Sequence, residues 1–247
     1  MADQRPPDNP IGSAMSDYDD LRHVTEERPC AYLPGLPARA QAYHVDCLDP
    51  ATHESLMGLG FRRSGNVVYR ARCRTCDKCQ AIRVTVRRFA PTRSQRRVAS
   101  RNLDVAVDIS TPVATDEKYE MFRRYLDAQH DGTMSRDRDV FTDFLYTSPT
   151  RTLEFVYKVK DRLVAVGIVD QCPSGLSSVY VFFDPAEKNR SLGTLSVLRE
   201  IECCREQGLP YYYLGLWVEG SKTMDYKARF RPNEILAGNG LWVPFRE

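Results

Sequence analysis

Residues 177–218, SSVYVFFDPAEKNRSLGTLSVLREIECCREQGLPYYYLGLWV, decide the fold of the C-terminal half of the chain. The apolar, β-branched run from Ser177 to Phe183 predicts a strand. Ser191 to Gln207 predict a helix, because their apolar residues recur at helical spacing on one stripe. Tyr211 to Val218 predict another strand. This order predicts two parallel strands joined by a crossover helix.

The residues before this unit extend the same pattern. Leu153 to Lys158 and Leu163 to Asp170 predict a hairpin. Two helices precede the hairpin, one starting at Thr115 and one around Val140. The C-terminal half therefore predicts the order helix, helix, strand, strand, strand, helix, strand, which indicates an α/β (α+β) fold.

The loop that opens the crossover helix, Arg190-Ser-Leu-Gly-Thr-Leu195, is a candidate anion site. Backbone N–H groups at a helix N-terminus attract anions, and Gly193 allows close approach. We expect Arg190, Ser191 and Gly193 to bind substrate, with an ordinary helix cap as the alternative. The loop and its flanking elements resemble the core of the GNAT (Gcn5-related N-acyltransferase) superfamily, where this loop holds the pyrophosphate of acyl-CoA. Leu195 stands where that superfamily usually has Gly or Ala, which argues against CoA.

Positive charge is concentrated in the N-terminal half of the chain. The 247 residues carry a net charge of +2, but the segment from Arg62 to Arg101 alone carries +12. Such a segment indicates a polyanionic partner, most often nucleic acid, although a solvated basic face is the alternative. A short helix predicted over 92–102 places four cations on one face: Arg93, Arg96, Arg97 and Arg101.

The cysteine motif Cys73-x-x-Cys76-x-x-Cys79 places three thiols within seven residues. This spacing suits tetrahedral zinc or an iron–sulfur cluster with a structural or regulatory role. Cys30 is the candidate for the fourth ligand. The alternative is a reduced cysteine turn that binds no metal.

We expect three segments: a disordered tail over 1–20, a smaller basic domain with the cysteine cluster over 21–110, and a GNAT-like domain over 111–247. The longest apolar run has seven residues, far fewer than the ~18 that cross a bilayer. The polar N-terminus shows no secretion signal. We therefore expect a cytoplasmic protein with reduced cysteines and no membrane partner.

Short blocks of sequence follow one another in the order of a known family. They are PCAYLP at 29–34, GFRRSG at 60–65, the cysteine motif, RSQRR at 93–97, VY at 179–180, FDP at 183–185, RSLG at 190–193, YLG at 213–215 and M-x-YK at 224–227. Together they resemble the arginyl-tRNA–protein transferases, in particular their compact bacterial leucyltransferase branch. The preference for leucine over arginine rests on this branch resemblance alone.

The resemblance implies an aminoacyltransferase that moves leucine from leucyl-tRNA to the α-amine of proteins beginning with Asp or Glu. That modification marks the acceptor for N-degron proteolysis. The implied partners are aminoacyl-tRNA and protein N-termini, with no DNA and no cofactor needed for the chemistry. A GNAT-type loop poorly suited to CoA, joined to a basic segment, fits an acyl donor carried on RNA.

We assign binding roles on this basis. Contacts with tRNA phosphates are expected from Arg93, Arg96, Arg97 and Arg101. Arg190 and the Gly193 loop are expected to hold the terminal CCA. A cation is needed for the acceptor's acidic side chain, and Arg62 or Arg63 is the candidate.

Catalytic roles follow from attack of an amine on an ester. Candidates for orienting the ester and donating to the oxyanion are Tyr180, Tyr226 and Lys227, although both tyrosines would also suit a plain core. Asp170 or Asp184 is the candidate for accepting the ammonium proton. Two other functions remain open: an acetyl-CoA-dependent N-acetyltransferase, and a non-enzymatic zinc-containing RNA-binding module.

Overall fold

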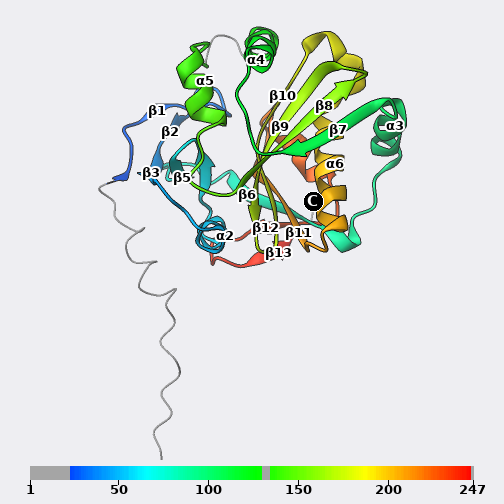
Figure 1. The fold of residues 1–247 in the computed structure, drawn as a ribbon. Helices are drawn as coiled ribbons and strands as arrows, with labels where there is room; N and C mark the ends of the chain where they lie inside the picture. The colour runs from blue at the N-terminus through cyan, green and yellow to red at the C-terminus, as the bar shows by residue number, and fades with distance from the viewer. Residues whose placement is uncertain (1–22, 130–133, 246–247) are drawn as a thin grey trace, which may run out of the picture.

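A computed structural model describes residues 23–129 and 134–245, so the predicted tail over 1–20 lies outside the described residues. The largest element is an eight-stranded mixed sheet (Figure 1). Its strands lie in the order β13 (Trp242–Pro244), β12 (Asn233–Leu236), β6 (Cys79–Thr85), β11 (Tyr211–Val218), β10 (Gly175–Phe183), β9 (Arg162–Cys172), β8 (Thr152–Val159) and β7 (Val105–Ser110).

The predicted crossover unit is confirmed. β10 leads through the 3₁₀ segment η3 (Pro185–Arg190) into α6 (Leu192–Glu206), and β11 returns parallel to β10. The predicted hairpin is also confirmed, because β8 and β9 pair antiparallel. The mixed α/β fold class predicted from the element order is therefore observed.

Helices cover both faces of this sheet. Along β8, Phe155 and Tyr157 pack toward α6, while Val156 between them packs toward α4 (Asp116–Gln129) and α5 (Arg138–Leu145). Figure 1 shows α6 and α3 (Arg93–Arg101) on one side of the strands and α4 and α5 on the other. This layering explains why the strands read as nearly continuous apolar runs.

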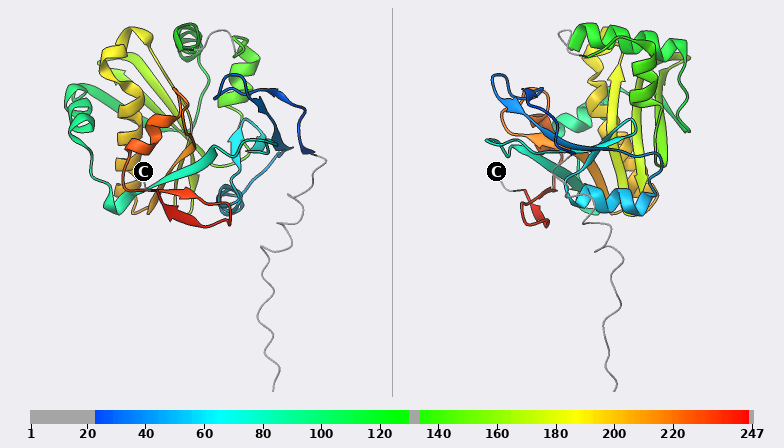
Figure 2. Two further views of the ribbon diagram at one scale, coloured as in Figure 1. Left: turned by 180° about the vertical axis from the view of Figure 1, so that it is seen from behind. Right: turned by 90° about the vertical axis from the view of Figure 1, so that its left-hand side faces the viewer.

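A three-stranded sheet stands beside the large one (Figure 2). It consists of β3 (Ala40–His44), β5 (Val67–Ala71) and β4 (Arg62–Ser64), and its core includes residues of α2 (Pro50–Gly58). The two-stranded ribbon of β1 (Arg28–Pro29) and β2 (Pro37–Ala38) completes the N-terminal strands.

The sequence analysis did not predict α2, although a signal was present. Asp49 caps the helix by accepting hydrogen bonds from Ala51 and Thr52, and Pro50 occupies its first turn. An Asp followed by Pro is a recognised helix start. The buried stripe of this nine-residue helix includes His53, so it did not read as an apolar face.

Strand β6 ends at Thr85, where a 3₁₀ turn, η2 (Val86–Arg88), follows. Strands β6 and β7 both lie within residues 79–110 and both belong to the large sheet, so one sheet contains strands from both sides of the predicted boundary. Within the described residues, no helix has the length and apolar character needed to cross a membrane.

Candidate active site at the divergence of two parallel strands

The candidate active site lies where β10 and β11 part. The two strands pair over only three positions, ending at Ser177 and Tyr213. Directly beyond this point each strand carries a register shift against its other neighbour, between Ser178 and Tyr180 and between Tyr213 and Gly215. Bulges of this kind interrupt pairing and re-aim side chains, and they are common beside active sites.

Three tyrosines approach one another near this divergence. Tyr180 of β10 contacts Tyr125 of α4 edge-on, with ring centroids 6.3 Å apart. Tyr226 belongs to η4 (Asp225–Arg229) and lies close enough to Tyr125 for the two hydroxyls to interact electrostatically. Burial raises the pKa of Tyr125 and Tyr226 to about 12 and raises that of Tyr180 as well. All three phenols are therefore neutral near pH 7 and can donate hydrogen bonds.

Two buried cations reach consecutive carbonyl groups of β11. Arg62 Nη2 donates to the Gly215 carbonyl at 3.3 Å, and Lys227 Nζ donates to the Leu216 carbonyl at 3.0 Å. Burial, followed by the nearby charge of Arg62, lowers the pKa of Lys227 to about 7. Burial also lowers the pKa of Arg62 to about 10.

Arg63 and Asp170, predicted in separate roles, form one buried ion pair. Arg63 Nε and Nη2 donate to the two carboxylate oxygens of Asp170 at 2.7 Å each. Thr152 donates to the same carboxylate at 2.7 Å, and His53 Nε2 lies 3.9 Å from it. Asp170 is fully buried, so both oxygens are engaged by the protein itself. Asp170, expected to take a proton, and Arg63, expected to bind the acceptor, are therefore engaged with each other inside the protein.

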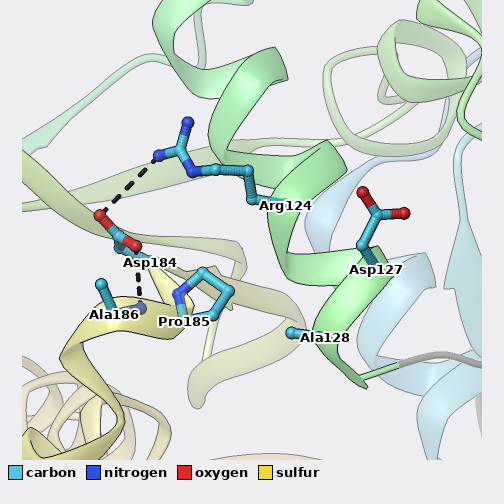
Figure 3. A pocket seen from close by; sticks show the side chains of 6 residues that line it. All are labelled: Arg124, Asp127, Ala128, Asp184, Pro185 and Ala186. Carbon is cyan, nitrogen blue, oxygen red and sulfur yellow. Dashed lines mark hydrogen bonds and ion pairs between the residues drawn. The ribbon is translucent and has the colours of Figure 1, made fainter.

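Asp184, the other candidate proton acceptor, lies at the opposite end of β10 from the strand pairing. It caps η3 by accepting from the Ala186 N–H at 3.0 Å and pairs with Arg162 at 3.3 Å and Arg124 at 3.8 Å. A surface hollow of about 610 Å³ opens beside it between α4 and η3 (Figure 3). Asp184 is thus an ion-paired cap at the edge of an open hollow.

The predicted anion site is the loop at the start of α6. Ser191 adopts a left-handed conformation (φ 56°, ψ 50°), and its side chain does not cap the helix. A Cβ at Gly193 would meet only the Phe183 ring, at 3.7 Å. Arg190, however, donates to both oxygens of Asp104 at 2.8 and 2.9 Å and to Glu187 at 2.6 Å. Its charge is therefore already balanced, and it is better placed to hold the loop than to bind phosphate.

The predicted arginine face exists and lies beside this loop. The helix α3 begins at the capping box formed by Thr92 and Gln95, and its inward face packs on α6. At the end of α3, Arg101 donates to the Asn189 carbonyl and Asn102 donates to the Arg190 carbonyl. Six exposed arginines continue along η2 and α3: Arg87, Arg88, Arg93, Arg96, Arg97 and Arg101. Within the described residues none of the six has a carboxylate partner, so their charge is available.

The four predicted metal ligands lie near one another. Burial raises the pKa of Cys79 to about 12, and the neighbouring thiols of Cys30, Cys73 and Cys76 contribute to the rise. Two backbone N–H groups donate to Cys30 Sγ, from Tyr32 at 3.5 Å and Leu33 at 3.4 Å. No set of three or more His, Cys, Asp or Glu side chains in residues 23–129 and 134–245 is already arranged to hold a metal ion.

A buried carboxylate that the sequence analysis missed lies under the divergence. Glu200 of α6 accepts hydrogen bonds from Ser196 and from the Tyr212 hydroxyl. Burial raises its pKa to about 7. Gly167 allows this group to approach β9, because a Cβ there would lie 2.9 Å from a Glu200 oxygen. On an otherwise apolar helical stripe, a lone Glu four residues after a Ser was the available signal.

Comparison with known proteins identifies the family. The description "Arginine-tRNA-protein transferase, N terminus" matches residues 28–97, and "Arginine-tRNA-protein transferase, C terminus" matches residues 117–237. The aspartate/glutamate leucyltransferase of Paracoccus denitrificans is 41% identical over 240 residues, covering 90% of this chain and 84% of that protein. The protein of the same name from Pseudomonas putida is 37% identical, covering 90% of this chain and 95% of its own. The chain belongs to the arginine-tRNA–protein transferase family and is an acyltransferase.

Solved structures resemble the chain more distantly. L-PGS from Bacillus licheniformis superimposes with a TM-score of 0.48 at 12% identity, over 66% of this chain and 57% of that one. FemX superimposes with a TM-score of 0.45 at 10% identity, over 69% of this chain and 61% of that one.

The buried ion pair generates a stability prediction. Asp170→Asn leaves the Arg63 guanidinium buried without a full counter-charge, so we expect the free energy of unfolding to fall by about 3–5 kcal/mol. Denaturant unfolding measures this loss. The matched control is Asp108→Asn, which breaks the exposed pair with Lys158 and should cost about 0–1 kcal/mol. Equal losses in the two variants would contradict this role for Asp170.

Proposed function

We propose that the protein transfers leucine from leucyl-tRNA to the α-amine of proteins that begin with Asp or Glu. The observation that carries the proposal is the α3 arginine face. Within the described residues its arginines have no carboxylate partner, and the face leads to the N-terminus of α6 beside the diverging strands. The names of the relatives support the same donor and acceptor. The product would enter N-degron proteolysis.

The tRNA contacts follow from the charges that remain available. The planar guanidinium group of an arginine can donate two hydrogen bonds to phosphate oxygens. Four such groups are available on this face: Arg93, Arg96, Arg97 and Arg101. The Ser191–Gly193 loop then offers backbone N–H groups at the helix N-terminus to the CCA end. Arg190, held by Asp104 and Glu187, fixes the shape of this loop.

The chemistry asks for little beyond placement and charge stabilisation. The acceptor amine attacks the ester carbonyl, a C–N bond forms, and the ester C–O bond to the tRNA ribose breaks. The proton lost by the amine ends on the ribose oxygen that leaves. Because an α-amine has a pKa of roughly 7.7–8.0, a useful fraction is neutral without a strong base.

Tyr180 and Tyr226 are our candidates for donating to the oxyanion, and Tyr125 joins them from α4. Their hydroxyls are neutral, and the three rings approach one another near the point where the two strands diverge. A donor aimed at the oxyanion is worth about 2.7–4 kcal/mol. Asp184 remains the candidate proton acceptor, at the rim of the hollow in Figure 3.

A GNAT-like core is part of the proposal. The order β8, β9, β10, α6, β11, with a parallel last pair, has the topology that the superfamily uses. Leu192 and Leu195 are both buried at the start of α6, which supports an RNA-borne donor over CoA at this loop. A metal-containing RNA-binding module alone would leave the tyrosine and cation groups without a role.

A metal held by Cys30, Cys73, Cys76 and Cys79 is also proposed. The four thiols share one region, and two N–H groups already point at Cys30 Sγ, as they do toward bound thiolates. A structural zinc ion or an iron–sulfur cluster there would fix the N-terminal loops. The transfer chemistry would not pass through it.

The function is tested by turnover with defined acceptors. We expect labelled leucine to move from leucyl-tRNA to peptides beginning with Asp or Glu, and little to matched peptides beginning with Ala or Lys. Acetyl-CoA should not replace the tRNA donor. Equal rates with all four acceptors, or acetyl transfer without tRNA, would exclude the proposed activity.

The α3 face is tested by the salt dependence of tRNA binding. Arg97→Ala should weaken tRNA binding at low salt and flatten log K against log[salt] by ~0.9 or less, because one phosphate contact is lost. The effect should not depend on tRNA sequence. The matched control is Arg123→Ala on α4, an exposed arginine paired with Glu120, which should leave the slope unchanged. An unaltered slope for Arg97→Ala would make α3 a merely solvated face.

The metal is tested by elemental analysis of protein purified without oxygen. About one zinc ion or one iron–sulfur cluster per chain is expected, and Cys76→Ser should lower that content and the thermal midpoint together. Absence of both metals, with all four thiols titrating freely, would refute the site.

A further inference from the structure

Four cations are buried in the described part of the chain: Arg62, Arg63, Lys118 and Lys227. Two of them have a carboxylate partner. Arg63 holds Asp170, and Lys118 donates to Glu154 at 2.5 Å. The other two, Arg62 and Lys227, have none within residues 23–129 and 134–245.

The unpaired cations share one place in the fold. Arg62 comes from β4 in the small sheet, and Lys227 comes from η4 beyond β11, yet they donate to neighbouring carbonyls of the bulged part of β11. They are close enough for the charge of Arg62 to lower the pKa of Lys227. Two like charges held together inside a protein repel, so this arrangement costs stability unless an anion joins it.

Their hydrogen-bonding capacity is also incomplete. Arg62 Nε is buried and has no acceptor. The residues Arg62 and Lys227 are only 6% and 9% exposed, so water supplies little compensation. Carbonyl groups satisfy some of the N–H donors but provide no negative charge.

The backbone next to Lys227 carries no side chain at Gly215. A Cβ added to Gly215 would lie 3.6 Å from Lys227 Nζ and 3.9 Å from the Ser178 carbonyl, both ordinary contact distances. Gly215 has φ +86°, a conformation that other residues rarely adopt. Gly215 therefore keeps the backbone beside Lys227 Nζ free of a side chain at this bulge.

We propose that Arg62 and Lys227 together bind the side-chain carboxylate of the acceptor's N-terminal residue. The proposal rests on the proposed transfer to Asp or Glu, and it places the specificity of that transfer on these two residues. It gives Lys227 a different role from oxyanion donation. Tyr226, its neighbour in the chain, stays beside the reacting ester, so one short segment serves both the carboxylate and the carbonyl.

Arg63 is excluded from this role by its pair with Asp170. That pair fixes β4 against β9, and Arg62, the preceding residue on β4, is thereby held toward β11. Successive side chains of a strand point to opposite faces, so one arginine can serve the structure while the other serves the substrate.

The test compares two acceptor peptides that differ only in an N-terminal Asp or Asn, with leucyl-tRNA as donor. Wild-type protein should strongly prefer Asp, and a wild-type protein without turnover on Asp would instead refute the proposed function. Lys227→Met and Arg62→Gln should each lower kcat/KM for the Asp peptide about 10- to 100-fold, mostly through KM. In these variants the ratio of kcat/KM for the Asp peptide to kcat/KM for the Asn peptide should also fall. The KM for leucyl-tRNA should stay unchanged.

Stability provides the second readout. Lys227→Met removes a buried charge without a partner, so its thermal midpoint in the absence of substrate should equal or exceed that of the wild type. The matched control is Lys118→Met, which leaves the Glu154 carboxylate buried without its cation and should lower the thermal midpoint. Arg62→Lys keeps the charge and should retain more Asp preference than Arg62→Gln.

Two outcomes would overturn the proposal. One is a folded Lys227→Met or Arg62→Gln protein that keeps the wild-type ratio of Asp to Asn turnover. The other is an equal loss with both peptides, accompanied by a lowered thermal midpoint in Lys227→Met, which would make the cations structural.

Discussion

The parallel pairing of β10 and β11 lasts for three residue pairs, and the arrangement of Tyr180, Arg62 and Lys227 depends on where it stops. Once the strands part, their facing backbone groups need other partners, because an unpaired buried N–H or C=O is costly. Arg62 and Lys227 supply some of those partners at Gly215 and Leu216. Directly after the bulge on β10, Tyr180 contacts Tyr125 of α4. The site that we propose for the acceptor N-terminus lies where this sheet is interrupted.

Buried charge has two different uses in this protein. Arg63 with Asp170 and Lys118 with Glu154 are complete pairs that tie separate elements together. Arg62 and Lys227 have no carboxylate partner within the described residues. Binding of an anionic ligand would offset the free-energy cost of burying them. Arg62 and Arg63 both lie on strand β4. The pair between Arg63 and Asp170 holds this strand in place and thereby also positions Arg62, which we assign to substrate recognition.

The helix α3 links the basic segment to the transferase unit. Gln95, Val98 and Asn102 face inward, and Asn102 bonds to the loop before α6. The arginines between them face solvent and have no carboxylate partner in the part of the chain that the structure describes. A phosphate backbone bound along α3 would therefore lead to the N-terminus of α6, which lies beside the divergence. In the function that we propose, this continuity allows a basic segment early in the chain to serve a site built mainly from later residues.

The sequence by itself determined the crossover unit, the β8–β9 hairpin, the arginine face of α3 and the family, because each depends on local periodicity or on short blocks of residues. It also indicated the cysteine group, which is set by spacing. Only the tertiary structure decided which charges are used internally. Arg62 and Arg63 are adjacent and chemically identical, yet Arg63 meets Asp170 from 107 positions away while Arg62 meets only carbonyl oxygens. The sequence around Arg190 indicates a free cation, whereas the fold places Asp104 and Glu187 beside it. Counter-charges come from residues distant in the chain, so no local pattern can show whether a cation is paired or available.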